Sequence, residues 1–309
     1  MATATPLDLS GDPRRHRRER LVGGVFCATA VTSLLVTALI LWSLFRNGWE
    51  FFSEVEWATV FGSDAWNPRQ NSFSLSTIVA ATLIVTGIAM AVAAPLGLGA
   101  AIYLSEYARP RVRSALKPVL EVLAGVPSVV LGFFALNWIA PNVVGRLVGE
   151  EHGRGGSMLA AGIGVGILSI PLVASVAEDA LRAVPASLRE ASAGLGARRM
   201  ATTLRVVLPA AVSGLVAAMI LASSRSIGET MVVFIAGGAT NTAQYTLAPT
   251  DSSLTMTAAM ASLATGTDQV RGSGLAVPSL YFVGIALFAI TLGLNLVADR
   301  FVRRVRQAY

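Results

Sequence analysis

The stretch that decides the fold is Phe73 to Ser105, FSLSTIVAATLIVTGIAMAVAAPLGLGAAIYLS, which has no charged residue along its whole length. A membrane helix needs about 20 apolar residues to cross roughly 30 Å of hydrocarbon, so this run is long enough to span a bilayer. Pro95 lies inside it, and we expect a kink or a helix end there because proline has no backbone N–H to donate. The run therefore predicts a membrane-spanning helix.

Five more apolar runs of similar length predict further spans. They are Leu21 to Phe45, Val122 to Pro141, Ser157 to Ala177, Val206 to about Gly238, and Leu275 to Ala298. Only 14% of the residues are charged, against roughly a quarter in soluble domains, which excludes an ordinary globular enzyme. The first run is too long for a signal peptide and has no small-x-small cleavage site, so we expect a retained span. The fold class predicted is an all-α integral membrane protein of about six transmembrane helices.

The basic residues predict the orientation of these spans. Eighteen Lys and Arg lie in the N-terminal arm, the second and fourth connections and the tail, and five lie in the other connections. Positively charged connections stay inside the cell, so both termini are expected in the cytoplasm. The predicted organisation is a basic cytoplasmic arm 1–20, a first transmembrane helix 21–45, an extracytoplasmic segment 46–72, a transmembrane core 73–298 with a cytoplasmic connection 178–209, and a cytoplasmic tail 299–309.

Two outer connections have distinctive compositions. The segment 46–72 is rich in Trp and Phe, and such rings favour the headgroup layer, so we interpret it as an interfacial cap on the outer face. The connection Ala239 to Gly274 contains the weakly apolar stretch Leu254 to Ala264. That stretch is too short to span the membrane, and it predicts a short or re-entrant helix at the outer mouth.

Several classes of chemistry are excluded. Cys27 is the sole cysteine, and His16 and His152 are the sole histidines, so we expect no disulfide, metal site or nucleophilic catalytic set. The cations form short clusters between apolar runs, not a patch with interleaved aromatics, which argues against nucleic acid. No GxxxxGK[ST] loop is present. We therefore expect no cofactor on this chain, and any ATP must be hydrolysed by another protein.

The connection Glu178 to Pro209 contains Glu190-Ala191-Ser192, then Gly196, and then Val206-Val207-Leu208-Pro209. This spacing resembles the EAA motif of ABC importer permeases, E-A-A-x3-G-x9-I-x-L-P, with Ser192 and Val206 as mild departures. Small side chains recur at i, i+4 and i+7 in this segment, so a helix here has one face that another backbone can approach. Glycine at 196 allows the helix to end in a sharp turn. We expect a docking element for a separate ATPase, and an ordinary amphipathic loop is the alternative.

A second motif, SRSIGETM from Ser224 to Met231, places Arg225 and Glu229 inside the fifth apolar run. A charge at membrane depth costs at least about 2.5–3.5 kcal/mol, so it faces a partner or a wet path. Their i, i+4 spacing predicts one helical face. Arginine offers a fork of donors suited to a tetrahedral oxyanion, and the carboxylate could accept a hydrogen bond from protonated phosphate. An internal ion pair that fixes helix packing fits the same chemistry equally well.

Two stretches, Pro95 to Leu136 and Ser226 to Val233, together with the last span and its Arg-rich tail, resemble phosphate-specific ABC transporter permease subunits. The GETM form is similar to the PstC type rather than its PstA-type partner. The resemblance implies the type I importer (MetI-like) fold in a bacterial inner membrane, and a transport path that includes Arg225 and Glu229, with Ser226 and Thr230 beside them. It also implies three kinds of partner: a PstA-type permease, a dimer of PstB-type ATPases and an extracytoplasmic phosphate-binding protein.

Three other functions remain open at this stage. The first is an ABC permease for another oxyanion, such as sulfate or molybdate. The second is a secondary transporter or channel that works alone, which leaves the spacing of Glu190 to Pro209 unexplained. The third is a membrane scaffold or sensor component without a transport role.

Overall fold

The computed structural model describes residues 13–306, apart from 239–241 and 267–273. Six helical stretches in this part of the chain are long and apolar enough to cross a membrane: Arg18–Glu54, Leu75–Tyr107, Ser128–Val148, Met158–Arg182, Arg199–Ile227 and Ala276–Arg300. The predicted all-helical membrane fold is therefore confirmed. Each stretch overlaps one of the apolar runs found in the sequence.

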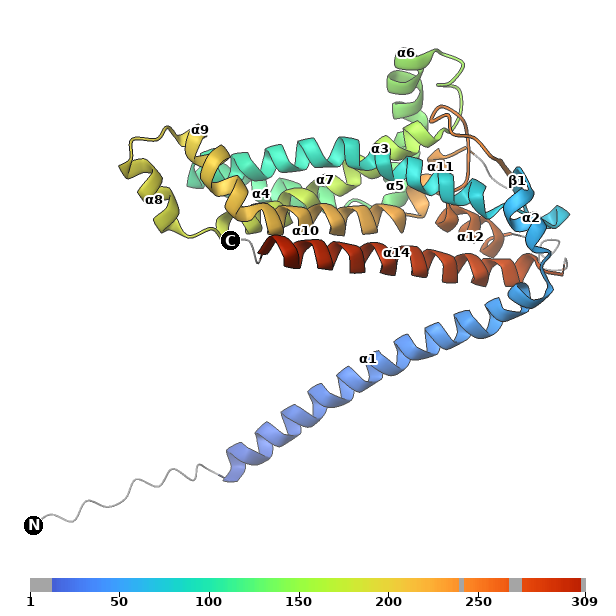
Figure 1. Ribbon diagram of the computed structural model, residues 1–309, viewed down its shortest axis with the longest axis horizontal. Coiled ribbons are helices and arrows are strands. Elements are labelled where there is room, and N and C mark those ends of the chain that lie inside the picture. Colours follow the sequence, from blue (N-terminus) through green and yellow to red (C-terminus); the bar gives the residue numbers. More distant parts are fainter. Residues whose placement is uncertain (1–12, 239–241, 267–273, 307–309) are drawn as a thin grey trace, which may run out of the picture.

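The bundle is built around two long helices, α3 (Leu75–Ile102) and α7 (Met158–Arg182), which pack against each other (Figure 1). Helix α3 runs through Pro95 without ending and continues as the π-helical turn η2 (Tyr103–Tyr107). The pair packs closely because glycine on one helix faces a branched side chain on the other, and small residues let helix backbones approach. These pairs are Gly97 with Val173, Gly162 with Ile88, and Gly166 with Val92.

Helices α10 (Leu208–Ile227) and α14 (Ala276–Arg306) lie beside this pair, and α10 packs on α7 and on α14. A third part of the bundle is an interrupted helix made of four consecutive segments. They are α4 (Pro110–Ala124), α5 (Ser128–Phe134), the π-helical η3 (Ala135–Val144) and α6 (Gly145–Val148). Helix α10 is itself followed, after a break, by the short helix α11 (Met231–Ala236). Helix α11 packs against α5, so two interrupted helices lie side by side.

One end of the bundle holds a small antiparallel sheet of order β2-β1-β3 next to α2 (Trp57–Gly62). The strands are β1 (Ala65–Asn67), β2 (Ser72–Phe73) and β3 (Ala243–Gln244), with the 3₁₀ turn η1 (Pro68–Gln70) between the first two. Trp66 pairs with Phe73 and with Ala243 in register, and its side chain is buried. The aromatic segment 46–72 is thus partly packed inside the protein. Only some of its rings, including Trp49, are exposed, as the predicted interfacial cap requires.

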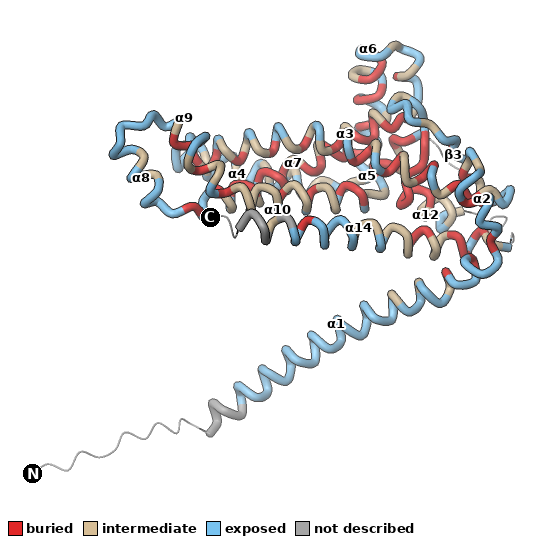
Figure 2. Tube along the Cα trace, in the orientation of Figure 1, coloured by how far each residue is buried: buried red, intermediate tan, exposed pale blue. Residues whose placement is uncertain are grey.

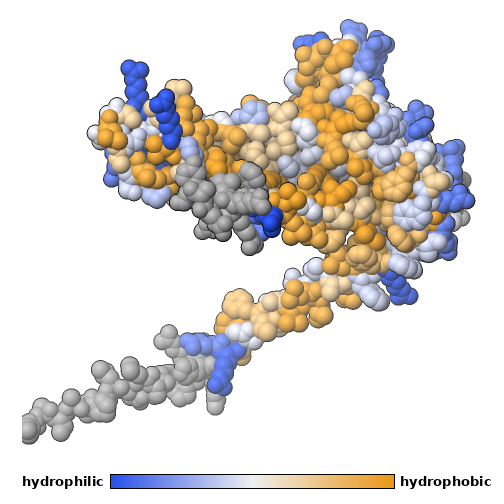
Figure 3. Space-filling view, in the orientation of Figure 1, coloured by the Kyte–Doolittle hydropathy of each residue, from blue (hydrophilic) through white to orange (hydrophobic). Residues whose placement is uncertain are grey.

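Helix α1 (Pro13–Glu54) diverges from the body and contacts α14 near the end of the bundle that holds the sheet (Figure 1). Figure 2 shows α1 exposed along most of its length, whereas burial concentrates in α3, α7 and the end of the bundle that holds the sheet. Apolar side chains cover the outside of the helices, and polar side chains gather toward the ends of the bundle (Figure 3). Such a surface suits a bilayer, in which lipid tails and not water surround the helices.

Helices α8 (Ala186–Gly194) and α9 (Arg199–Thr202) project at the end of the bundle where α14 finishes, opposite α2 and α6 (Figure 1). The π-helical turn η4 (Thr203–Val207) then joins α9 to α10. The predicted helix in the connection Ala239 to Gly274 is present as α12 (Met256–Ala264).

Candidate functional site

The break after α10 holds the residues predicted to line a transport path. Helix α10 ends at Ile227, and Gly228 closes its last turn. Glu229 and Thr230 therefore lie between α10 and α11 and do not continue the helix. The prediction that Arg225 and Glu229 share one helical face is wrong, because the helix stops between them.

Arg225 occupies the last turn of α10 and is exposed. Within the described residues its guanidinium has no hydrogen bond and no ion pair, so no ion pair joins it to Glu229. Glu229 is half-buried, and its Oε1 accepts a hydrogen bond from the N–H of Val232 at 3.4 Å in the first turn of α11. Thr230 donates to the carbonyl of Gly228 at 3.3 Å. The five donors of the guanidinium are thus free to bind a ligand or a partner chain.

Ser226, the third predicted path residue, is buried and faces away from Arg225 into the helix packing. Its hydroxyl donates to the carbonyl of Ala222 at 2.9 Å and lies 3.2 Å from the hydroxyl of Ser169 on α7. This pair ties α10 to α7 next to the break. The structure therefore gives Ser226 a packing contact.

Helix α12 contacts the same break. Thr257, in its first turn, donates a hydrogen bond from its hydroxyl to the carbonyl of Glu229 at 2.7 Å. The N–H of Met256 donates to the hydroxyl of Thr82 on α3 at 3.0 Å. The N–H of Met256 belongs to the first turn of α12, where N–H groups have no intrahelical partner, and the carbonyl of Glu229 lies in the break between α10 and α11. The short helix α12 thus fixes the backbone at Glu229.

A second interruption, Gly125 to Pro127, separates α4 from α5. Gly132 on α5 lies against α11, where a Cβ at this glycine would come 3.2 Å from the carbonyl of Met231 and 3.0 Å from the Ile235 side chain. The two interrupted helices therefore pack closely beyond their breaks.

The connection 178–209 forms a short helix and a sharp turn, as the glycine at 196 predicts. Gly196 adopts a φ of 78°, a left-handed conformation that glycine accepts at no steric cost. The N–H of Gly196 donates to the carbonyl of Ala193, and the N–H of Ala197 donates to the carbonyl of Ser192. This pair of bonds is a Schellman motif, which ends α8 and reverses the chain.

Around this turn, the motif residues divide into exposed and packed positions. Glu190 and Ala191 are exposed on α8, and Ser192 shares a hydrogen bond of 2.8 Å with Thr202. Leu208 and Pro209 open α10, half-buried. The π-helical turn η4 precedes Pro209, which fits the missing N–H of proline at that point of the helix.

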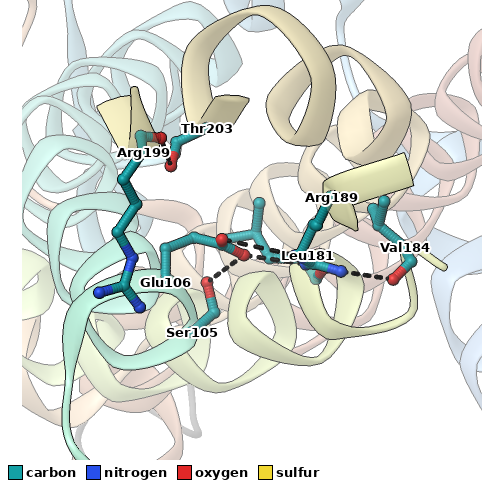
Figure 4. Close-up of polar contacts among 7 residues, drawn as sticks. All are labelled: Ser105, Glu106, Leu181, Val184, Arg189, Arg199 and Thr203. Atoms are coloured by element: carbon teal, nitrogen blue, oxygen red, sulfur yellow. Dashed lines mark hydrogen bonds and ion pairs between the residues drawn. The ribbon is translucent and has the colours of Figure 1, made fainter. Parts of the chain in front are cut away.

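Arg189 anchors α8 to the helices of the bundle (Figure 4). Its Nη2 donates to Glu106 Oε1 at 2.9 Å and to the carbonyl of Leu181 at 2.8 Å, and its Nη1 donates to the carbonyl of Val184 at 2.6 Å. Glu106 is buried at the end of α3, in η2, and Leu181 lies in the last turn of α7. One side chain therefore joins α8 to the ends of both central helices.

A second buried carboxylate, Glu178 on α7, is 1% exposed and binds α4. Arg113 donates a hydrogen bond to it, and the Nζ of Lys117 lies 3.9 Å from its Oε2. Sequence reasoning missed Glu106, Glu178 and Arg189, because their partners lie 65 to 83 residues away in the chain. The available signal was a carboxylate next to, or inside, a predicted apolar span, where an unpaired charge is costly.

Among the described residues no group of three His, Cys, Asp or Glu is placed to hold a metal ion. The site therefore consists of a free guanidinium at a helix break, hydroxyls that fix that break, and a projecting connection anchored by Arg189.

Comparison with known proteins identifies relatives for most of the chain. Residues 93–307 match the family described as "Binding-protein-dependent transport system inner membrane component". "Phosphate transport system permease protein PstC 1" of Mycobacterium tuberculosis is 32% identical over 284 residues, covering 84% of this chain and 83% of that protein. "Phosphate transport system permease protein PstA 1" of the same species is 32% identical over 226 residues, covering 73% and 70%.

The fold also matches solved structures. The crystal structure of a bacterial alginate ABC transporter in complex with alginate pentasaccharide-bound periplasmic protein contains a chain with a TM-score of 0.68. The match covers 94% of this chain and 97% of that one at 14% identity, so the likeness is one of fold alone.

Proposed function

Since this chain belongs to the family of binding-protein-dependent transport system inner membrane components, we propose that it is a permease subunit of an ATP-driven phosphate importer. A relative named as a PstC permease and one named as a PstA permease are both 32% identical to this chain over the residues that they match. The PstC relative matches a larger share of the chain, which favours the PstC-type role in the pair.

The observation that supports this function is the free guanidinium of Arg225 at the break between α10 and α11. Its neighbour Ser226 contacts Ser169, which lies midway along α7, so Arg225 sits within the transmembrane part of the bundle. A charge there is expensive, at least about 2.5–3.5 kcal/mol, unless a ligand or a wet path compensates it. The fork of N–H donors matches the oxygens of a tetrahedral anion.

Glu229 would add selectivity to this site. One carboxylate oxygen accepts a hydrogen bond from a backbone N–H of α11, and the other carboxylate oxygen has no hydrogen bond within the described part of the chain. A carboxylate accepts hydrogen bonds but cannot donate them. It therefore favours protonated phosphate over fully ionised sulfate. Thr230, in the same break, offers a hydroxyl close to this acceptor.

ATP hydrolysis on a partner would act on this chain through the connection 178–209. This chain has no phosphate-binding loop for ATP, so hydrolysis falls to a partner, a dimer of PstB-type ATPases. The docking surface comprises the exposed face of α8 and the turn behind it. Its residues are Glu190, Ala191, Ser192 and Gly196, with Leu208 and Pro209 where the connection enters the membrane.

Two further partners complete the proposed importer: a PstA-type permease that supplies the other wall of the path, and a phosphate-binding protein at the end that holds α2, β1 and α6. The multi-pass chain lies in the bacterial inner membrane. The charge distribution supports a cytoplasmic location for both termini and for the connection 178–209.

A substrate titration of the purified complex tests this proposal. The four-subunit complex is incubated with binding protein loaded with phosphate, sulfate or molybdate, and ATP hydrolysis is measured. We expect stimulation by the phosphate-loaded protein alone. Stimulation by sulfate or molybdate with no response to phosphate would assign the permease to another oxyanion, and ATP-independent transport by this chain alone would remove it from the importers.

A further inference from the structure

Arg189 joins the proposed ATPase-docking helix to the two central helices of the bundle. We propose that Arg189, paired with Glu106, is the positioning residue that passes movement of α8 to α3 and α7, and so couples ATP hydrolysis to transport. This inference rests on the proposed function, since it assumes that an ATPase moves α8.

Arg189 makes its contacts with groups that have no other strong partner. The carbonyl of Leu181 lies in the last turn of α7, where helix carbonyls lack an intrahelical donor, and the carbonyl of Val184 lies just beyond the end of that helix. Glu106 is 7% exposed, and its charge requires a paired cation. A single guanidinium satisfies all three acceptors, which a lysine ammonium could not do with the same planar geometry.

Helix α8 has few other means of moving the bundle. None of its nine residues is buried, so it has no apolar face packed into the core. The hydrogen bond of Ser192 goes to Thr202, which belongs to the same connection. Arg189 is thus the side chain of α8 that binds directly to α3 and α7 in the described structure.

Neighbouring residues of α8 point to different partners. Glu190 is exposed and available to an ATPase, whereas Arg189 turns inward to Glu106 (Figure 4). The inward contact reaches α7, which in turn is tied to α10 by the hydroxyl pair of Ser169 and Ser226 beside the break. This gives a continuous set of contacts from the docking helix to the turn that holds Arg225.

The test measures phosphate taken up per ATP hydrolysed, using the complete complex with its binding protein in proteoliposomes. We expect Arg189→Gln to assemble and to hydrolyse ATP, but to lower uptake per ATP at least about tenfold, because breaking a buried ion pair removes a strong constraint. Glu106→Gln should give the same loss. The double variant should be no worse than either single variant, since both act through one contact.

Two further variants separate coupling from folding and from docking. Arg182 belongs to the same connection but has no ion pair within the described residues. The variant Arg182→Gln should therefore take up as much phosphate per ATP hydrolysed as the wild type. Glu190→Gln should instead weaken ATPase binding and lower hydrolysis and uptake together. Arg189→Lys keeps the charge and should restore part of the ratio.

A normal ratio in Arg189→Gln, in a complex whose wild-type form transports phosphate, would overturn this inference and leave the proposed function intact. Loss of assembly in both Arg189→Gln and Arg189→Lys would also overturn it, because the residue would then be needed for folding. A wild-type complex that shows no ATP-driven phosphate uptake would instead refute the proposed function.

Discussion

A methyl group added at Gly162 should destabilise the protein, because this glycine lies where α7 crosses α3. An ideal Cβ at this position would come 2.7 Å from the Cβ of Ile88 and 3.2 Å from the carbonyl of Val85. The Cβ of Ile88 is attached to the helix backbone, so α3 and α7 must move apart to make room. Overpacking of this kind costs about 1–3 kcal/mol.

Gly87, on α3, provides the matched control. A Cβ built there meets no atom within 4 Å. Replacing glycine by alanine inside a helix gains about 1 kcal/mol in helix propensity at either position. Gly87→Ala should therefore be neutral or stabilising, and Gly162→Ala should be less stable than Gly87→Ala by about the overpacking cost of 1–3 kcal/mol.

The assay is thermal unfolding of the two purified variants in the same detergent, followed by tryptophan fluorescence. A difference of 1 kcal/mol shifts Tm by about 2–4 °C in a chain of 150–250 residues, so we expect Gly162→Ala to melt several degrees below Gly87→Ala. Equal melting temperatures would refute the reasoning, because they would show that α3 and α7 do not approach closely at this crossing.

Three other predictions follow from single contacts. Thr257→Val removes the donor to the carbonyl of Glu229, costs roughly 1–3 kcal/mol for the unpaired group, and should slow phosphate uptake, whereas Thr257→Ser should restore it. Glu178→Gln leaves Arg113 and Lys117 without their carboxylate and should lower the free energy of unfolding by roughly 1–3 kcal/mol in a denaturant titration, while the exposed Glu190→Gln should not. Gly196→Ala forces a Cβ into the left-handed conformation at a cost of about 1–2 kcal/mol and should weaken co-purification of the ATPase, and Gly99→Ala, on α3 where an added Cβ meets no atom within 4 Å, is its control.

The sequence predicts the spans well because each depends on local composition. An uncharged run such as Phe73 to Ser105 is long enough to cross a bilayer and is too apolar for the surface of a soluble protein. The six helical stretches confirm the spans that such runs predict. The turn at Gly196 is also a local property, since the left-handed conformation there favours glycine, and the structure has it.

Contacts between distant residues are beyond such reasoning. Nothing near Glu106 in the sequence indicates that Arg189 is its partner, because the pair forms when α8 folds back against the ends of α3 and α7. The i, i+4 rule failed at Arg225 and Glu229 because it assumes an unbroken helix, and α10 ends at Ile227. The role of α12 was likewise hidden, since only tertiary packing brings Thr257 to the break.

The central claim is that a guanidinium at the helix break receives phosphate while ATP hydrolysis on a partner drives transport. The most direct measurement is uptake of labelled phosphate into proteoliposomes that contain the complete complex, with Arg225 or with Arg225→Gln, in the presence and absence of ATP. We expect ATP-dependent uptake by the Arg225 complex and none by an equally well assembled Arg225→Gln complex. Undiminished uptake by Arg225→Gln, or equal uptake without ATP, would contradict the account.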